Sequence, residues 1–129
     1  MKRIQHIIQI GEREYLVPVE LRILSDSEEA IDIASLQAAQ KQLARELLAK
    51  MPDAPDEGFF NFLMNISGMT NSEVARFMRI DPSAISQWRR GSKNLSSTAW
   101  QAFRIFFDDL FTNGKITVSM FLSNKEVAA

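Results

Sequence analysis

The chain of 129 residues contains no cysteine, which excludes disulfide bonds and thiolate metal sites. His6 is the single histidine, so a metal centre or a nucleophile–base pair lacks a second imidazole. Five glycines are scattered singly, and no glycine-rich phosphate loop is present. The sequence contains no run of about 18 apolar residues, so no membrane span is predicted. We therefore expect a cytoplasmic protein that is not an enzyme and that binds no metal, cofactor or membrane.

Adjacent carboxylates occur at Glu28–Glu29 and Asp108–Asp109. Neighbours on a helix point about 100° apart, which suits a solvated face better than a shared acid–base site. With 46% hydrophobic and 24% charged residues, the composition is typical of a globular protein. The length fits one average domain, or one small domain with an appendage.

Residues 70–91 predict two short helices that meet at a tight turn. Thr70 and Glu73 have the spacing of a capping box, which begins the first helix. Asp81 followed by Pro82 is the start expected for the second helix. Gly91 then ends that helix in the left-handed conformation.

Apolar residues recur at helical spacing through both of these helices, so we expect them to pack across the turn. The inward set is Val74, Ala75, Met78, Ile80, Ile85 and Trp88.

The side chains left outward on the second helix suit the major groove of DNA. Ser83 and Ala84 are small enough for close approach, and Gln87 offers the amide that pairs with an adenine edge, so these three are the predicted base contacts. A polar and basic rim predicts phosphate contacts; it comprises Asn71, Arg76, Arg79, Ser86, Arg89, Arg90 and Lys93. The alternative is an ordinary helical hairpin with a solvated charged face.

This stretch resembles the helix-turn-helix of the Cro/C1 (Xre-type) family, in which a Thr-Gln-x-x-x-Ala helix precedes a Ser-x-x-x-Ile-Ser-x-Trp-Glu-x-Gly helix. The matching positions are Thr70, Ala75, Ile85, Ser86, Trp88 and Gly91. Asn71 replaces the usual Gln, and Arg89 replaces the usual Glu, which removes an internal ion pair and adds a phosphate contact. The resemblance implies a transcriptional regulator, a repressor that binds double-stranded DNA. Such a motif works as a homodimer on an inverted-repeat operator.

Charge is distributed unevenly around a net of −1. Residues 10–67 carry a net charge of −6, whereas residues 68–95 carry +3. The acidic front half indicates a second surface for something other than nucleic acid, such as a basic protein. The alternative is a solvated acidic surface without a partner.

The front half predicts a β-hairpin and a long helix. Two strands are expected at residues 4–10 and 15–24, joined by a turn at residues 11–14. Pro18 places the second strand at a sheet edge, or at least turns its missing N–H outward. The run Ser25–Glu28 predicts the start of a helix from about residue 27 to Lys50.

The remaining segments complete an α+β fold that is mainly α. A connector at residues 51–56 leads to a helix at residues 57–66, and Ser96–Thr98 begins a later helix that Asn113–Gly114 ends. Residues 116–122 predict a strand that pairs with the hairpin of the same chain or of a second copy. The expected division is 1–51 for dimerisation or partner binding, 56–114 for a four- to five-helix Cro/C1-type domain, and 115–129 for the strand and tail.

The order of elements also resembles the MqsA (YgiT-type) antitoxins, although the two Cys-x-x-Cys pairs typical of their zinc site are missing here. The resemblance implies an antitoxin and autorepressor with a cognate toxin as partner. The alternative is a stand-alone repressor of phage or plasmid type, without a toxin.

Overall fold

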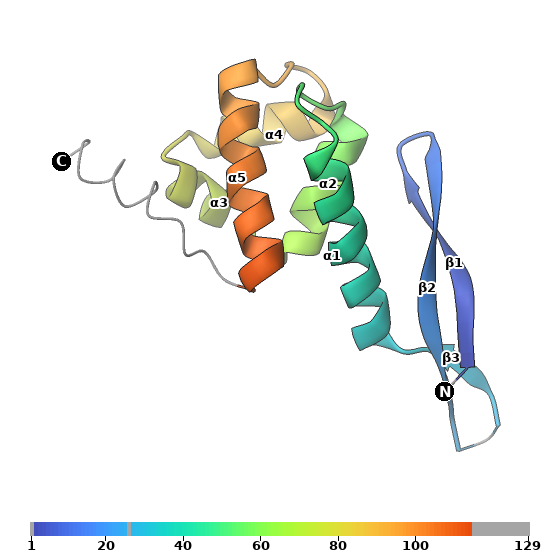
Figure 1. Ribbon diagram of the computed structural model, residues 1–129. Coiled ribbons are helices and arrows are strands. Elements are labelled where there is room, and N and C mark those ends of the chain that lie inside the picture. Colours follow the sequence, from blue (N-terminus) through green and yellow to red (C-terminus); the bar gives the residue numbers. More distant parts are fainter. Residues whose placement is uncertain (1, 26, 115–129) are drawn as a thin grey trace.

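A computed structural model describes residues 2–25 and 27–114 of the chain (Figure 1). A three-stranded sheet comes first, and helices follow it, which confirms an α+β fold in which helix predominates. The elements are β1 (Lys2–Ile10), β2 (Arg13–Ile23), β3 (Glu29–Ile31), α1 (Ile33–Ala49), α2 (Glu57–Ser67), α3 (Asn71–Met78), α4 (Pro82–Arg90) and α5 (Ser97–Asn113). The strand expected at residues 116–122 lies outside the described residues.

The sheet is antiparallel, with strand order β1-β2-β3. Ile10 pairs with Arg13, so the β1–β2 turn contains only Gly11 and Glu12 and is shorter than the expected turn at residues 11–14. Gly11 has a φ of 62°, which glycine adopts easily and which a tight two-residue hairpin requires.

The predicted start of the long helix at residue 27 is wrong. The chain turns back after β2, where the N–H of Leu24 donates to the carbonyl of Glu28 at 2.8 Å, and β3 then pairs with β2. The helix α1 begins only at Ile33, because Asp32 is its N-cap and accepts from the N–H of Ser35 at 3.0 Å. The serines and acids of residues 25–28 suit a helix start as well as a turn, and pairing with β2 favours the turn.

Pro18 lies on β2, which is the middle strand, yet its nitrogen faces a part of the β2 edge that β3 does not pair with. The N–H of Glu20 donates to Ser35 Oγ at 2.8 Å, and its carbonyl accepts from the N–H of Asp32 at 2.8 Å, so Glu20 turns its backbone groups toward β3 and α1. Pro18, two residues away, turns the same way, but β3 pairs only with residues 21–23. The expected orientation of Pro18 is therefore confirmed.

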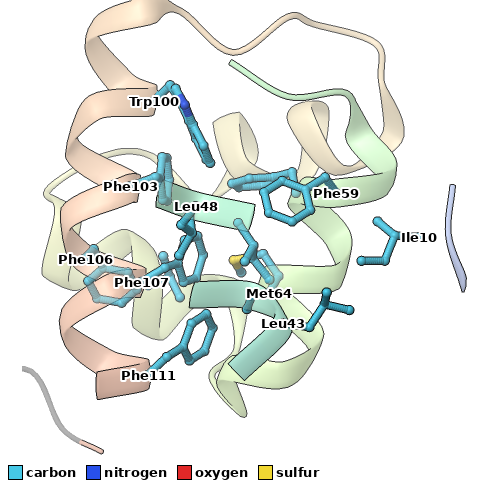
Figure 2. Close-up of a cluster of buried hydrophobic side chains, with 14 of the residues drawn as sticks. Ile10, Leu43, Leu48, Phe59, Met64, Trp100, Phe103, Phe106, Phe107 and Phe111 are labelled. Carbon is cyan, nitrogen blue, oxygen red and sulfur yellow. The ribbon is translucent and has the colours of Figure 1, made fainter. Parts of the chain in front are cut away.

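Buried side chains from the sheet and the helices form one continuous core. Figure 2 shows the aromatic side chains of α5 along one side of the cluster; Trp100, Phe103, Phe106 and Phe107 are fully buried. Ile10 from the sheet and Leu43 from α1 join the same cluster. The aromatic side chains of α5 are thus part of the core, and this core extends across the boundary expected between residues 51 and 56.

Backbone contacts fix the front half to the helices. A Cβ added at Gly58, in the first turn of α2, would lie 3.0 Å from the Cα of Gly11, so the tip of the hairpin approaches α2 closely. The indole N–H of Trp100 donates to the carbonyl of Met51 at 3.0 Å, and Gln101 Nε2 donates to the carbonyl of Pro52 at 2.8 Å. The connector at residues 51–56 is therefore anchored on α5.

Candidate nucleic-acid interface

The helix α3 begins with the predicted capping box. The N–H of Glu73 donates to Thr70 Oγ1 at 3.1 Å, and the N–H of Thr70 donates to Glu73 Oε1 at 2.9 Å. The hydrogen bond from the Thr70 backbone, followed by that with its side chain, lowers the pKa of the Glu73 carboxyl. The cap is therefore strongest while Glu73 is ionised.

The helix α4 begins and ends as expected. Asp81 is its N-cap and accepts from the N–H of Ser83 at 2.9 Å, a hydrogen bond that lowers the pKa of the Asp81 carboxyl. Pro82 occupies the first turn, and Gly91 ends the helix with a φ of 73°. In the turn between the helices, Arg79 takes a left-handed conformation with a φ of 57°. Two well-delimited helices therefore meet across three residues.

The inward face of both helices is confirmed. Val74, Ala75 and Ile85 are buried, and the half-buried Met78, Ile80 and Trp88 pack against the core. Trp88 meets Phe60 and Phe103 edge to face, with ring centroids 6.3 and 5.7 Å apart. These contacts fasten α4 to α2 and α5 through one side of the helix.

The opposite side of α4 faces outward. Ser83 and Arg90 are exposed, and Ala84 and Gln87 are half-exposed. Ser83, Gln87 and Arg90 follow the i, i+4, i+7 spacing that aligns side chains on one helical face, and Ala84 lies beside Ser83 in the first turn. Arg76, Arg79 and Lys93 are also exposed, and with Arg90 they form no salt bridge within residues 2–25 and 27–114. A polar strip with unneutralised basic side chains therefore lies on the surface.

Arg89 occupies an arrangement that sequence reasoning missed. Its Nε donates to Asn61 Oδ1 at 2.6 Å, its Nη1 to Asn71 Oδ1 at 2.9 Å and its Nη2 to Asn65 Oδ1 at 2.8 Å. Asn61 Nδ2 returns a bond to the Arg89 carbonyl at 2.8 Å, and Asn71 Nδ2 donates to Ser86 Oγ at 3.4 Å. We call Asn61, Asn65 and Asn71 the asparagine cradle of Arg89.

The asparagine cradle joins three helices without cancelling a charge. Its members come from α2 and α3, whereas Arg89 belongs to α4. In the described part of the chain no carboxylate lies within salt-bridge distance of Arg89. Three of the five guanidinium N–H groups are used, which leaves two for another acceptor. Asn71, Ser86 and Arg89, predicted as separate phosphate contacts, therefore belong to one hydrogen-bonded group.

Comparison with models of protein families, with curated proteins and with solved structures finds no match for this chain. Within the described residues, no group of three or more His, Asp or Glu side chains is placed to hold a metal ion. The helices of this part of the chain also lack the length and apolar composition needed to cross a bilayer. The surface of α3 and α4 is therefore the candidate functional site of this chain.

Proposed function

We propose that the protein is a cytoplasmic transcriptional regulator, a repressor that binds specific sequences of double-stranded DNA by inserting α4 into the major groove. The observation that carries the proposal is the two-sidedness of α4. Ile85 and Trp88 hold one side against the core, and the polar strip of Ser83, Ala84, Gln87 and Arg90 faces outward. A groove-binding helix needs such a fixed back and an accessible polar front.

The base contacts are assigned to the exposed front of α4. Ser83 and Ala84 lie in its first turn, where small side chains let the backbone approach the base edges. Gln87 lies one turn later and is half-exposed. Its amide pairs with N6 and N7 of an adenine, a two-bond contact that discriminates between bases by about 1–3 kcal/mol.

The phosphate contacts are assigned to the basic rim. Arg76, Arg79, Arg90 and Lys93 are exposed and form no salt bridge with the described acids, so their charge is available for the DNA backbone. Arg89 contributes its two remaining N–H groups from a position fixed by the asparagine cradle. Its charge is not neutralised there, because amide oxygens carry no net charge.

A single helix of this size contacts few base pairs, so the proposal includes a homodimer on an inverted repeat. Two copies of α4 related by a two-fold axis would enter successive major grooves about 34 Å apart on one face of the duplex.

The proposal is tested by titrating purified protein against duplexes at several salt concentrations. Gln87→Ala should weaken the preferred site by about 1–3 kcal/mol and relax discrimination at one base pair. Arg90→Ala should weaken all duplexes alike and flatten the dependence of log K on log salt by about one unit. Unchanged preferences in the Gln87→Ala protein would remove Gln87 from the base contacts.

A second activity, neutralisation of a cognate toxin, is supported by a groove in the front half. This groove lies between β2 and α1, and its lining includes Glu20, Asp32, Glu46 and Arg3. Glu20 pairs with Arg3 at 3.8 Å and Asp32 pairs with Arg22 at 3.1 Å, so Glu46 is the carboxylate of the lining that forms no salt bridge among the described residues. The apolar side chains of Leu16 and Ile33 are exposed nearby, at 66% and 69%. An acidic, partly apolar groove fits a basic protein surface.

The test is coexpression with the protein encoded next to this chain. Glu46→Lys in the groove should weaken a fixed-stoichiometry complex, whereas Arg90→Ala should leave the complex intact. Isolation of the chain without that neighbour would favour a stand-alone repressor.

A further inference from the structure

The strand β1 has one unpaired edge. Within residues 2–25 and 27–114 it pairs only with β2, and α1 packs on β2, so β1 borders the sheet in this part of the chain (Figure 1). Glu20 turns its backbone groups toward β3 and α1, so the odd-numbered residues of β2 turn theirs toward β1. The odd-numbered residues of β2 pair with the even-numbered residues of β1, whose backbone groups therefore point toward β2. The N–H and C=O groups of Arg3, Gln5, Ile7 and Gln9 therefore point outward from the sheet.

This edge lacks the features that usually prevent strand pairing. β1 has nine residues without proline, and its register with β2 runs unbroken from Lys2 to Ile10. Residues 4–10 include no acidic, lysine or arginine side chain. At the centre Ile7 is 53% exposed, directly opposite the exposed Leu16 of β2. A long, regular and uncharged edge of this kind favours addition of another strand.

The sequence of β1 shows which strand fits. Residues 4–10, Ile-Gln-His-Ile-Ile-Gln-Ile, are nearly palindromic about Ile7. An antiparallel copy centred there places Ile4 against Ile10 and Gln5 against Gln9, so only His6 meets an unlike residue, Ile8. Two-fold symmetric interfaces require such self-complementarity, because each residue of one copy meets its mirror position in the other.

We propose that two copies of the chain associate through β1, antiparallel and centred on Ile7, so that their sheets become one. The centring agrees with the backbone directions, because it pairs odd-numbered residues with odd-numbered residues. The outward N–H and C=O groups of Gln5, Ile7 and Gln9 then meet those of Gln9, Ile7 and Gln5 in the second copy.

The inference deepens the homodimer of the proposed function, but it rests on the strand alone. It states which segment joins the copies, and it leaves α4 of each copy outside the seam.

The first test measures the association state by sedimentation equilibrium. Ile7→Lys places two like charges face to face at the two-fold axis and should raise the dimer dissociation constant about tenfold or more. Leu16→Lys is the matched control, since it replaces an apolar side chain that is also exposed but lies one strand away from the seam, and it should leave the dimer intact. Ile7→Pro is a second variant. Proline at this position removes an N–H group that points away from β2 but leaves the hydrogen bonds between β1 and β2 in place. This variant should therefore also be a folded monomer.

The second test measures the register by disulfide cross-linking. The chain has no cysteine of its own, so any cross-link must form between the introduced thiols. In the Ile7→Cys variant the two thiols lie opposite each other, with Cα atoms about 5.5 Å apart, and mild oxidation should give a covalent dimer. In the Gln5→Cys variant the two thiols are displaced by about 14 Å along the strands and should not cross-link.

A monomeric wild-type protein overturns the inference. So does a dimer that Ile7→Lys leaves intact and in which Ile7→Cys does not cross-link. DNA titration of the same proteins separates the two proposals: a β1-linked dimer without sequence preference refutes the proposed function alone, and specific binding by a dimer that ignores Ile7→Lys refutes the inference alone.

Discussion

At the scale of single residues, Arg89 shows how a cation is held without being neutralised. Its guanidinium reaches three asparagine oxygens at 2.6 to 2.9 Å, from two helices other than its own. An aspartate in any of these places would give a stronger pair but would cancel the charge. The asparagine cradle therefore combines two roles, since it fixes the end of α4 and keeps a positive group on the proposed DNA side.

We predict that Arg89→Lys lowers the free energy of unfolding by about 1 kcal/mol, because an ammonium cannot donate in the planar fork that reaches three separate oxygens. DNA affinity should also fall, although the charge is kept. Urea unfolding and DNA titration measure the two effects. Arg90→Lys is the matched control, since Arg90 is exposed on the same helix and its replacement should change neither property appreciably. Equal behaviour of the two variants would show that the cradle does not position α4.

At the scale of elements, carboxylates at the starts of two helices make the stability of the folded protein depend on pH. Glu73 and Asp81 cap α3 and α4, and hydrogen bonds to Thr70 and Ser83 lower their pKa values. A carboxyl whose pKa is lower in the folded state stabilises that state above its unfolded pKa. This contribution disappears as the pH falls through the folded pKa.

The predicted result is an unfolding free energy that decreases as the pH drops below about 4, with part of the decrease assigned to these two caps. Glu73→Gln and Asp81→Asn should each reduce the acid-induced loss, because the new side chains do not titrate. Urea unfolding at neutral and acidic pH measures the difference. Glu12→Gln, in the β1–β2 turn and part of no helix cap, is the control. If all three variants lose stability like the wild type, the caps are not the titrating groups.

The contact of the hairpin tip with α2 predicts a stability change for Gly58→Ala that is opposite in sign to the usual effect of this substitution in a helix. Replacing a helical glycine by alanine ordinarily stabilises a helix by up to about 1 kcal/mol. Gly58→Ala should instead destabilise the protein, because its Cβ would lie 3.0 Å from the Gly11 backbone. Thermal unfolding measures the sign. Ser72→Ala on the exposed side of α3 should show the ordinary small gain, and a gain at both sites would contradict the close approach.

Elements with local signals were predictable from the sequence. The caps at Thr70, Asp81 and Ser96 and the left-handed ends at Gly91 and Gly114 depend on residues within one turn, and the structure confirms each of them. The start of α1 was not predictable in this way. Ser25, Ser27 and Glu28 suit a helix start, and only the pairing of β3 with β2 shows that the chain turns back there.

In the candidate nucleic-acid interface, too, local features were predictable from the sequence and contacts between distant residues were not. The two faces of α4 follow from helical periodicity and are confirmed. The asparagine cradle was missed because Asn61 and Asn65 lie 28 and 24 residues from Arg89 in sequence. Their i, i+4 spacing on α2 places them on one helical face, but nothing local shows what that face meets.

At the scale of the whole molecule, one core joins two segments of opposite net charge. Residues 10–67 carry −6 and contain the groove beside α1, whereas residues 68–95 carry +3 and contain α3 and α4. The continuous core joins both segments, so under our proposal a second copy joined through β1 would bring a second α4 into the assembly.

The central claim is that the outward side of α4 distinguishes base pairs in duplex DNA. Its most direct test is selection of bound sequences from random duplexes with the purified full-length protein, at moderate salt and with bulk competitor DNA. The account predicts enrichment of an inverted repeat whose half-sites are centred about 10 base pairs apart. A selected pool in which no sequence is enriched over the starting library would contradict it.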